Sequence, residues 1–274
     1  MRKRDFLQDG DVLGKPVPRP RLRAPGPYMT RVTIIAAMAG ELKPLVRGWR
    51  HERRNGVKLW RWRFDEGEWV AACSGAGVEA ATRAFAEVER AGAVDVAIST
   101  GWAGALSDEF AAGKAYGVSG VIDARTGERF PVAAWPEGEL QAAEPWLVTS
   151  PKVADTAEKR RLAAAYGAGL VDMEAAGVAR LAAMRGIPFY CVKGVSDGVR
   201  DQLPDFNRFI SANGRFQLGR FIAFSIQRPW HWSALVRMGE NSRMAAQGIR
   251  ESLLENLDRQ GAIRKRNGYP NFRR

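Results

Sequence analysis

Continuous apolar runs alternate with amphipathic stretches along most of the chain, from residue 32 to residue 227. Runs such as VTIIAA have the length and composition of strands that are buried on both faces. They predict strands at 32–37, 94–100, 169–173 and 187–196, and a strand hairpin at 57–64 and 68–73. Apolar residues spaced by three and four predict helices at 41–48, 78–91, 156–166, 174–185 and 205–227. This alternation implies an α/β protein whose largely parallel sheet is covered by helices on both faces.

The two ends of the chain differ from this central body. Residues 1–28 are rich in proline and arginine and lack an apolar period, which predicts a disordered basic tail. The folded domain is expected to span residues 29–227, with Met29 as a candidate start. Residues 228–274 predict a helical extension with a basic tail. We expect its helices to pack on the body; its tryptophans and arginines leave open weak contact with a membrane surface or a partner.

The net charge is concentrated in the ends. The chain has 274 residues and a formal net charge of +12. Residues 1–31 carry a net charge of +5 and residues 228–274 of +6, whereas residues 32–227 carry +1. Basic ends attract polyanions. The nearly neutral body argues against nucleic acid as the main partner, and a polyanion-binding protein is kept as an alternative.

The compartment is read from three features of the sequence. No apolar run approaches the roughly 18–20 residues that span a bilayer. The basic N-terminus is not followed by the apolar stretch of a secretory signal. Cys73 and Cys191 fall in predicted strands without CxxC spacing, which favours a reduced protein. We therefore expect the protein in the cytoplasm, with no transmembrane segment.

Candidate chemistry rests on carboxylates. The two histidines, His51 and His231, lie away from strand ends, so neither a metal site nor a Ser-His-Asp triad is expected. Glu41, Glu174 and Asp197 instead follow predicted strands, and ligands of open parallel sheets bind at the carboxyl ends of strands. Singly, each is also typical of a helix cap or a solvated charge. Together they suit a proton donor, an anchor for sugar hydroxyls and a base for water.

Two glycine-containing loops follow predicted strands in the same way. SGAGVEA (74–80) fits the loose G-x-G-x-x-A pattern of dinucleotide sites, but the acidic partner that would bind a ribose is misplaced. TGWAGAL (100–106) is the second loop. Both are predicted to present backbone N–H groups to an anion or a heterocycle, or else to be tight turns only.

Five motifs together resemble the nucleoside phosphorylase and nucleosidase superfamily. They are AAMAGE (36–41), SGAG (74–77), TGWAGAL (100–106), VDMEAAGVA (171–179) and VKGVSD (192–197). The closest likeness is to the methylthioadenosine/S-adenosylhomocysteine nucleosidases and the hopanoid-associated phosphorylases, over about residues 30–227. The resemblance implies a three-layer α/β/α sandwich around a mixed, mostly parallel sheet. It also implies a homo-oligomer, a dimer or larger, that acts on a small nucleoside.

The resemblance assigns roles to the motif residues. Asp197 matches the acid that donates a proton to N7 of a purine, Glu174 the anchor of the ribose hydroxyls, and Glu41 the base that activates water. Met173 matches the methionine packed on the sugar, and Ser196 the serine that supports the acid. The remaining positions expected to contact substrate or to orient the site are Asp172, Gly75, Trp102, Ala103, Gly104, Lys193, Val153 and Phe206. Lys193 replaces the usual arginine and is expected to orient Asp197.

Two departures from the family pattern bear on the reaction. Trp102 stands where the phosphorylases carry a serine that holds phosphate, and an indole offers a single N–H donor. Val153 lies where the nucleosidases stack an aromatic ring on the base. The Val153 departure argues against ordinary methylthioadenosine as the substrate. Because Glu41 suits water activation and Trp102 weakens the phosphate site, hydrolysis is favoured, without cofactor or metal. Phosphorolysis, with phosphate as co-substrate, and a non-catalytic nucleoside-binding protein are the alternatives.

Overall fold

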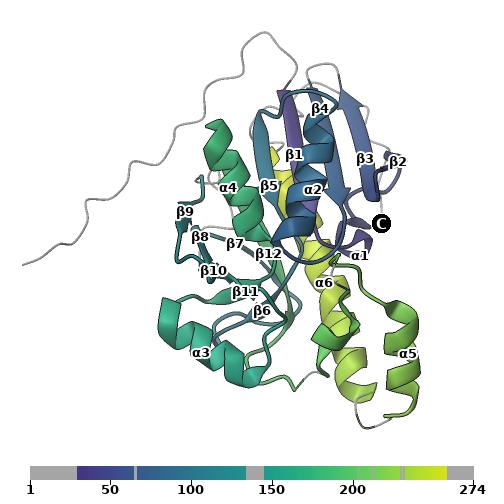
Figure 1. Cartoon of the computed structure of the whole chain (residues 1–274), viewed down its shortest axis with the longest axis vertical. Helices are drawn as coiled ribbons and strands as arrows, with labels where there is room; N and C mark the ends of the chain where they lie inside the picture. Colours follow the sequence, from purple (N-terminus) through teal and green to yellow (C-terminus); the bar gives the residue numbers. More distant parts are fainter. Residues whose placement is uncertain are drawn as a thin grey trace, which may run out of the picture.

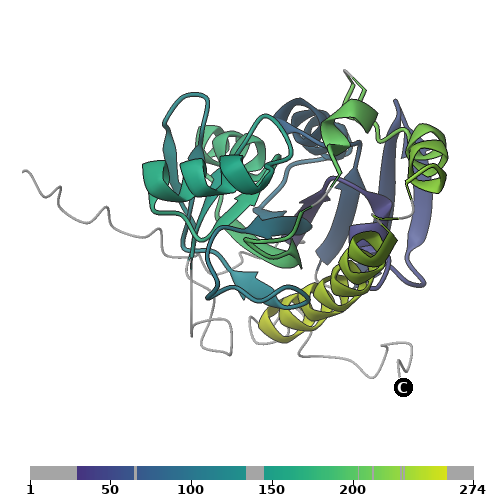
Figure 2. The same cartoon turned by 90° about the horizontal axis from the view of Figure 1, so that it is seen from below.

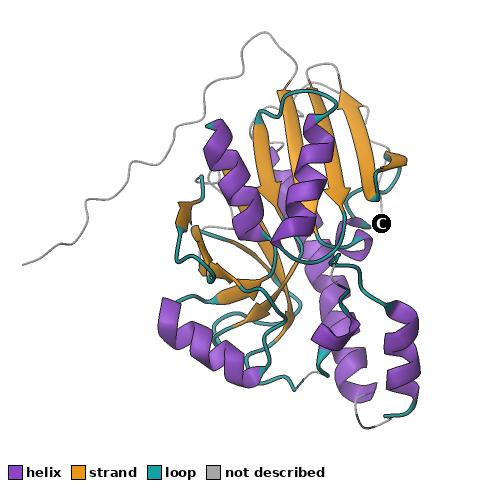
Figure 3. Cartoon of the chain, in the orientation of Figure 1, coloured by secondary structure: helices purple, strands orange, loops and turns teal. Residues whose placement is uncertain are grey.

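A computed structural model describes residues 30–64, 67–133, 145–202, 204–211, 213–228, 230 and 232–257. They build a mixed twelve-stranded sheet with helices on its faces (Figures 1 and 3). The strands are β1 (Thr30–Ala36), β2 (Arg50–Arg54), β3 (Val57–Phe64), β4 (Gly67–Cys73), β5 (Val96–Ser99), β6 (Trp102–Ala105), β7 (Ala115–Gly117), β8 (Gly120–Asp123), β9 (Arg129–Pro131), β10 (Trp146–Thr149), β11 (Leu170–Asp172) and β12 (Phe189–Asp197). The helices are α1 (Ala39–Leu42), α2 (Val78–Glu89), α3 (Thr156–Tyr166), α4 (Ala175–Arg185), the 3-10 helix η2 (Phe206–Phe209), α5 (Leu218–Ile226) and α6 (Trp232–Leu257).

Strand β12 joins the two halves of the sheet. The strands run in the order β2-β3-β4-β1-β5-β12-β6-β11-β10-β8-β9, and β7 pairs with β12. The first half of β12 pairs with β5 in parallel, and its last residues pair with β6 in parallel. β6 is antiparallel to β11, so the sheet is mixed. The long strand thus carries its final residue, Asp197, into the second half of the sheet.

The central strands bury both of their faces, as their continuous apolar runs predict. In β1, Ile35 faces the core under α2 and α4, whereas Val32 and Ile34 face the core under α1 and α6. A smaller core packs α3 against β8, β10 and β11. Figure 2 shows the sheet between these helical layers. The predicted fold class, an α/β/α sandwich around a mixed sheet, is confirmed.

Several predicted elements differ in extent from the observed ones. The helix predicted at 41–48 is the single turn α1, because Pro44 lacks the N–H that would continue it. The helix predicted at 205–227 divides into η2 and α5, since the intervening chain turns at Gly214 (φ 73°) and forms an Ile210–Phe216 bridge. The predicted loop 100–106 contains strand β6.

The region after residue 227 packs on the sheet through helix α6. Its buried residues are Ser242, Ala245, Ala246, Ile249 and Leu253. Gly194 of β12 lets α6 approach closely, since a Cβ at this position would lie 2.7 Å from Ala245 Cβ. Residues 1–28 and 258–274 lie outside the described residues, and the predicted domain boundaries remain predictions. No helix among the described residues has the length and apolarity needed to cross a bilayer.

Candidate active site

Glu41 lies buried in α1, immediately after β1. Its Oε1 accepts a hydrogen bond from Trp102 N at 2.9 Å, and its Oε2 accepts one from Met38 N at 2.7 Å. Gly101 (φ 116°) makes this contact feasible, because a Cβ there would lie 2.9 Å from the Glu41 carboxylate. Burial raises the pKa of Glu41 above its ordinary value, although the two N–H donors act to lower it.

Asp172 and Lys193 form a fully buried ion pair. Lys193 Nζ lies 2.8 Å from Asp172 Oδ2, and both side chains are 0% exposed. Lys193 also donates to Thr100 O, and Asp172 accepts from Thr149 Oγ1 and Ala175 N. Burial alone would lower the pKa of Lys193, but its attraction to Asp172 raises it instead.

The expected contact between Lys193 and Asp197 is therefore corrected. Among the described residues, the carboxylate that pairs with Lys193 is Asp172. Lys193 and Asp197 are four residues apart on one strand, and in an extended chain this separates their Cα atoms by about 13 Å. The Lys193 side chain that contacts Asp172 therefore does not also contact Asp197. The cation that pairs with Asp197 is Lys159, which belongs to α3.

Glu174 completes a group of four ionisable residues. Its Oε1 accepts from Gly77 N at 2.7 Å, and its Oε2 from Met173 N at 3.3 Å. Burial and then repulsion by Asp172 raise the pKa of Glu174 to about 8. Lys193 acts against this shift, and Glu41 adds to it. Glu41, Asp172, Glu174 and Lys193 are thus close enough to share one electrostatic cluster, which we call the carboxylate cluster.

Asp197 lies at a bulge at the end of β12. The register with β6 shifts between Val195 and Asp197, so Ser196 is the extra residue. Ser196 Oγ donates to Asp197 Oδ1 at 2.6 Å, and Lys159 Nζ from α3 forms an ion pair with Asp197 Oδ2. Lys159 also donates to Gly198 O at 2.6 Å. A Cβ at Gly104 would lie 3.1 Å from Asp197 Oδ2, so this glycine keeps room for the pair.

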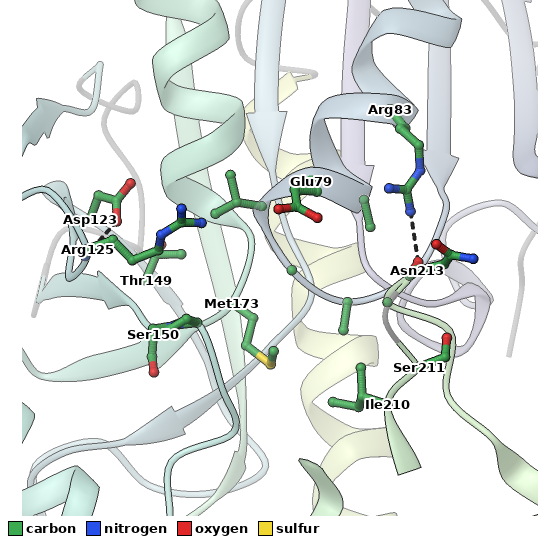
Figure 4. A pocket seen from close by; sticks show the side chains of 16 residues that line it. Glu79, Arg83, Asp123, Arg125, Thr149, Ser150, Met173, Ile210, Ser211 and Asn213 are labelled. Atoms are coloured by element: carbon green, nitrogen blue, oxygen red, sulfur yellow. Dashed lines mark hydrogen bonds between the residues drawn. The ribbon is translucent and has the colours of Figure 1, made fainter. Parts of the chain in front are cut away.

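A cavity of about 290 Å³ opens beside Met173 and Thr149, which adjoin Glu174 and Asp172 (Figure 4). Glu41, Glu174 and Asp197 are not among the residues that line it. Met173, which precedes Glu174, is the predicted site residue that lines it. The N-terminal end of α2, Thr149, Ser150 and the segment from Ile210 to Gly214 form its walls. Arg83 lies on the rim and donates to Asn213 O at 2.8 Å.

Other predicted residues do not line this cavity. The Trp102 side chain points to α6, where Nε1 donates to Ser242 O at 3.0 Å. The backbone of Val153 exchanges hydrogen bonds with the Asn207 side chain. Phe206 packs in an aromatic group with Phe216 and Phe221. Gly75 N donates to Ala37 O, and Ala103 O accepts from Ser196 Oγ, so both brace the loops around the carboxylates.

Two residues of the site, Lys159 and Thr149, lie outside the five sequence motifs. Lys159 is 1% exposed although it lies in the charged stretch EKRR of α3. Thr149 ends β10 and orients Asp172, and its place at a strand's carboxyl end is the signal that could have identified it. Among the described residues, no group of three or more His, Cys, Asp and Glu side chains could hold a metal ion.

Several solved structures have a similar fold. The methylthioadenosine nucleosidase of Arabidopsis thaliana has a TM-score of 0.65 and 18% identity, over 88% of this chain and 97% of that one. The 5'-methylthioadenosine/S-adenosylhomocysteine nucleosidase of Helicobacter pylori gives 0.58 and 16%, over 83% and 99%. Futalosine hydrolase of the same organism gives 0.60 and 15%, over 83% and 98%. No curated protein matches the chain by sequence.

A likeness in sequence covers part of the chain. The family model of the Phosphorylase superfamily matches residues 146–217, which include the Met173–Glu174 motif and Asp197. The resemblance to this superfamily is therefore confirmed over this stretch of the chain, and the solved structures show the same fold.

Proposed function

We propose that the protein hydrolyses the N-glycosidic bond of a purine nucleoside or of a substrate that carries an adenosyl group. The observation that carries this proposal is the pair of buried carboxyls, Glu41 and Glu174, in one electrostatic cluster, together with Met173, the neighbour of Glu174, which lines a cavity. The named activities of the structural neighbours, nucleosidases and a hydrolase, support it.

Glu41 is the proposed base for the attacking water. Both of its oxygens are held by backbone N–H groups, which fixes the carboxyl without using all of its lone pairs. A raised pKa makes it a better proton acceptor near neutral pH. Water would add to C1′ of the sugar as the bond to the base breaks, and Glu41 would take the proton that the water loses.

Glu174 and Met173 are proposed to bind the sugar. With a pKa of about 8, the Glu174 carboxyl is mostly protonated at neutral pH and can both donate to and accept from neighbouring hydroxyls. Met173 offers an apolar side chain to the cavity. These two consecutive residues would hold the ribose against the carboxylate cluster.

Asp197 is the proposed proton donor to the leaving base. Ser196 and Lys159 hold one oxygen each, so the carboxyl has a fixed direction. Asp197 would carry its proton when the substrate is bound. Passed to a ring nitrogen, that proton would neutralise the charge that the base acquires as it leaves, and Asp197 would be left as the carboxylate that pairs with Lys159. Lys159 is added here as a positioning residue for this acid.

Water is favoured over phosphate as the attacking group. The Trp102 side chain is tied to α6 by its one donor, and it offers no hydroxyl at this position. We propose that the protein uses no cofactor and, by analogy with the family, that it forms a homo-oligomer. Burial raises the pKa of Cys73 and of Cys191 to about 12, so both thiols are poorly reactive, which suits the proposed cytoplasmic location.

A chromatographic assay for free base tests the reaction. The full chain is incubated with adenosine, methylthioadenosine and inosine, each with and without phosphate. Release of base without phosphate is expected. Release only with phosphate would make the protein a phosphorylase and would overturn the role of Glu41, and release from none of the three under either condition would overturn the proposal for these substrates.

A further inference from the structure

Helix α5 and the start of α6 expose an unusual number of large apolar side chains. Leu218, Ile222 and Ile226 recur at intervals of four and therefore lie on one face of α5. Trp230, Trp232 and Val236 follow in the chain and are exposed as well. The six side chains are between 48% and 69% exposed. We call these six residues the α5 surface.

The opposite face of α5 is firmly packed. Phe221 and Phe224 meet Phe209 with ring centroids 5.4 and 5.1 Å apart, and Phe221 also meets Phe206 and Phe216 at 5.3 Å. The helix is thus apolar on both faces, and one charged residue, Arg220, lies within it. A helix that is apolar all round is normally buried, in a core or in lipid. The aromatic group holds the α5 surface outward.

The charge around this surface has one sign. Residues 206–239 contain no aspartate, glutamate or lysine, and their five arginines are Arg208, Arg215, Arg220, Arg228 and Arg237. Arg208 pairs with Asp205. Arg220 donates to Gln217, and Arg228 stacks on the Phe224 ring at 3.9 Å; both of these partners are neutral. Arg220, which lies on α5, and Arg228, which follows it, therefore carry charges that these contacts leave uncompensated.

We infer that the α5 surface binds the interface of an anionic lipid bilayer. Apolar side chains that include tryptophan, flanked by arginine, are typical of helices that lie in the plane of a membrane. A second copy of the chain fits less well. A two-fold interface places the same patch of both subunits face to face, which would bring the arginines of one copy against those of the other. An anionic bilayer interface suits both features: the apolar side chains enter the acyl boundary, and the arginines meet the anionic headgroups.

Vesicle flotation with the full chain tests this inference. Neutral phosphatidylcholine vesicles are compared with vesicles that also contain phosphatidylglycerol. The wild-type protein is expected to float with the anionic vesicles. The double variant Ile222→Ser/Ile226→Ser should lower the partition coefficient by about tenfold or more, because it removes apolar contact. Arg220→Gln/Arg237→Gln should weaken binding to anionic vesicles and leave the weak binding to neutral vesicles unchanged.

Matched controls separate this surface from the basic ends of the chain. Met184→Ser removes an apolar side chain that is 75% exposed on α4, which lies far from α5 (Figure 1). It should bind as the wild type does. Thermal melting of each variant checks that the fold is kept. Equal binding by the wild type and the isoleucine variant would mean that the basic ends alone attract the vesicles, and would overturn the inference.

Two other results would also overturn it. One is the absence of flotation with anionic vesicles at low salt. The other is a lipid-free dimer that Ile222→Ser/Ile226→Ser dissociates while vesicle binding stays absent, which would make the α5 surface a protein interface. Light scattering on the eluting protein measures this second outcome.

Discussion

Within the part of the chain that the structure describes, two buried lysine–aspartate pairs share strand β12 and differ in access to solvent. Lys193 and Asp172 are both fully enclosed and hold the carboxylate cluster together. In the pair of Lys159 and Asp197, the aspartate side chain is 12% exposed. An enclosed pair can support the site, whereas a partly open one can meet a substrate. Lys193 and Asp172 therefore form a structural pair, whereas Lys159 and Asp197 form the pair that we propose to take part in the reaction.

Removal of Lys193 should have the largest effect on stability. Lys193→Met leaves Asp172 buried without its cation, and breaking one partner of a buried pair is expected to cost about 3–5 kcal/mol of unfolding free energy. Urea denaturation measures this loss. Arg200→Met is the control, because its pair with Asp108 is exposed and should contribute at most about 1 kcal/mol. A loss from Lys193→Met no larger than that of the control would contradict the structural role.

Replacement of Glu41 should mainly affect the reaction. Glu41→Gln removes the proposed base, so base release without phosphate should fall by about a hundredfold or more. The amide NH₂ would also face one of the two N–H donors, so a smaller loss of stability is expected, about 1–3 kcal/mol. Glu251→Gln, on the exposed side of α6, is the matched control. Unchanged hydrolysis in a folded Glu41→Gln protein would exclude Glu41 as the base.

Removal of Lys159 should destabilise the fold less than removal of Lys193. Water can reach Asp197 and replace part of the lost interaction, so Lys159→Met should cost about 1–3 kcal/mol. The same variant should lower kcat and alter its pH profile, whereas Lys159→Arg should recover part of both. If Lys159→Met were the more destabilising variant, with kcat unaltered, the distinction between the pairs would be lost.

Glu174 should give its signal as a slope of stability with pH rather than as a fixed loss of stability. Its pKa is about 8 in the folded protein against an ordinary value of 4.5, so between these values the folded state binds a proton that the unfolded chain has released. The stability that Glu174 contributes is therefore present below the lower value and is lost as pH rises through the higher one. Glu174→Gln should flatten this decline, measured by denaturation at several pH values. An unchanged slope would contradict the buried, protonated carboxyl.

The positions of the motifs relative to buried strands predict that the three carboxylates lie at one edge of the sheet. Glu41 and Glu174 follow buried strands, and Asp197 ends one, so the rule for parallel sheets predicts their common edge. The apolar runs of β1, β5 and β12 likewise predict strands buried on both faces. Both signals are local in the sequence, which is why they could be read from it.

The partners of these residues depend on contacts that the sequence pattern does not show. Lys159 lies among four consecutive charged residues, and such a run is normally solvated. Its burial follows from the approach of α3 to the bulge at Ser196, which no pattern indicates. The Trp102 indole is held by a carbonyl 140 positions later in the chain. The match to the family and closeness in sequence predict that Lys193 orients Asp197, whereas in the structure Lys193 forms its ion pair with Asp172.

The role of Asp197 is the central claim, and one measurement tests it most directly. The rate of base release in phosphate-free buffer is compared for the wild type, Asp197→Asn and Ser196→Ala. Asp197→Asn should lower kcat by about 10²–10⁴-fold while the protein stays folded, and Ser196→Ala should have a milder effect. A rate for folded Asp197→Asn within about threefold of the wild type would show that Asp197 does not donate the proton.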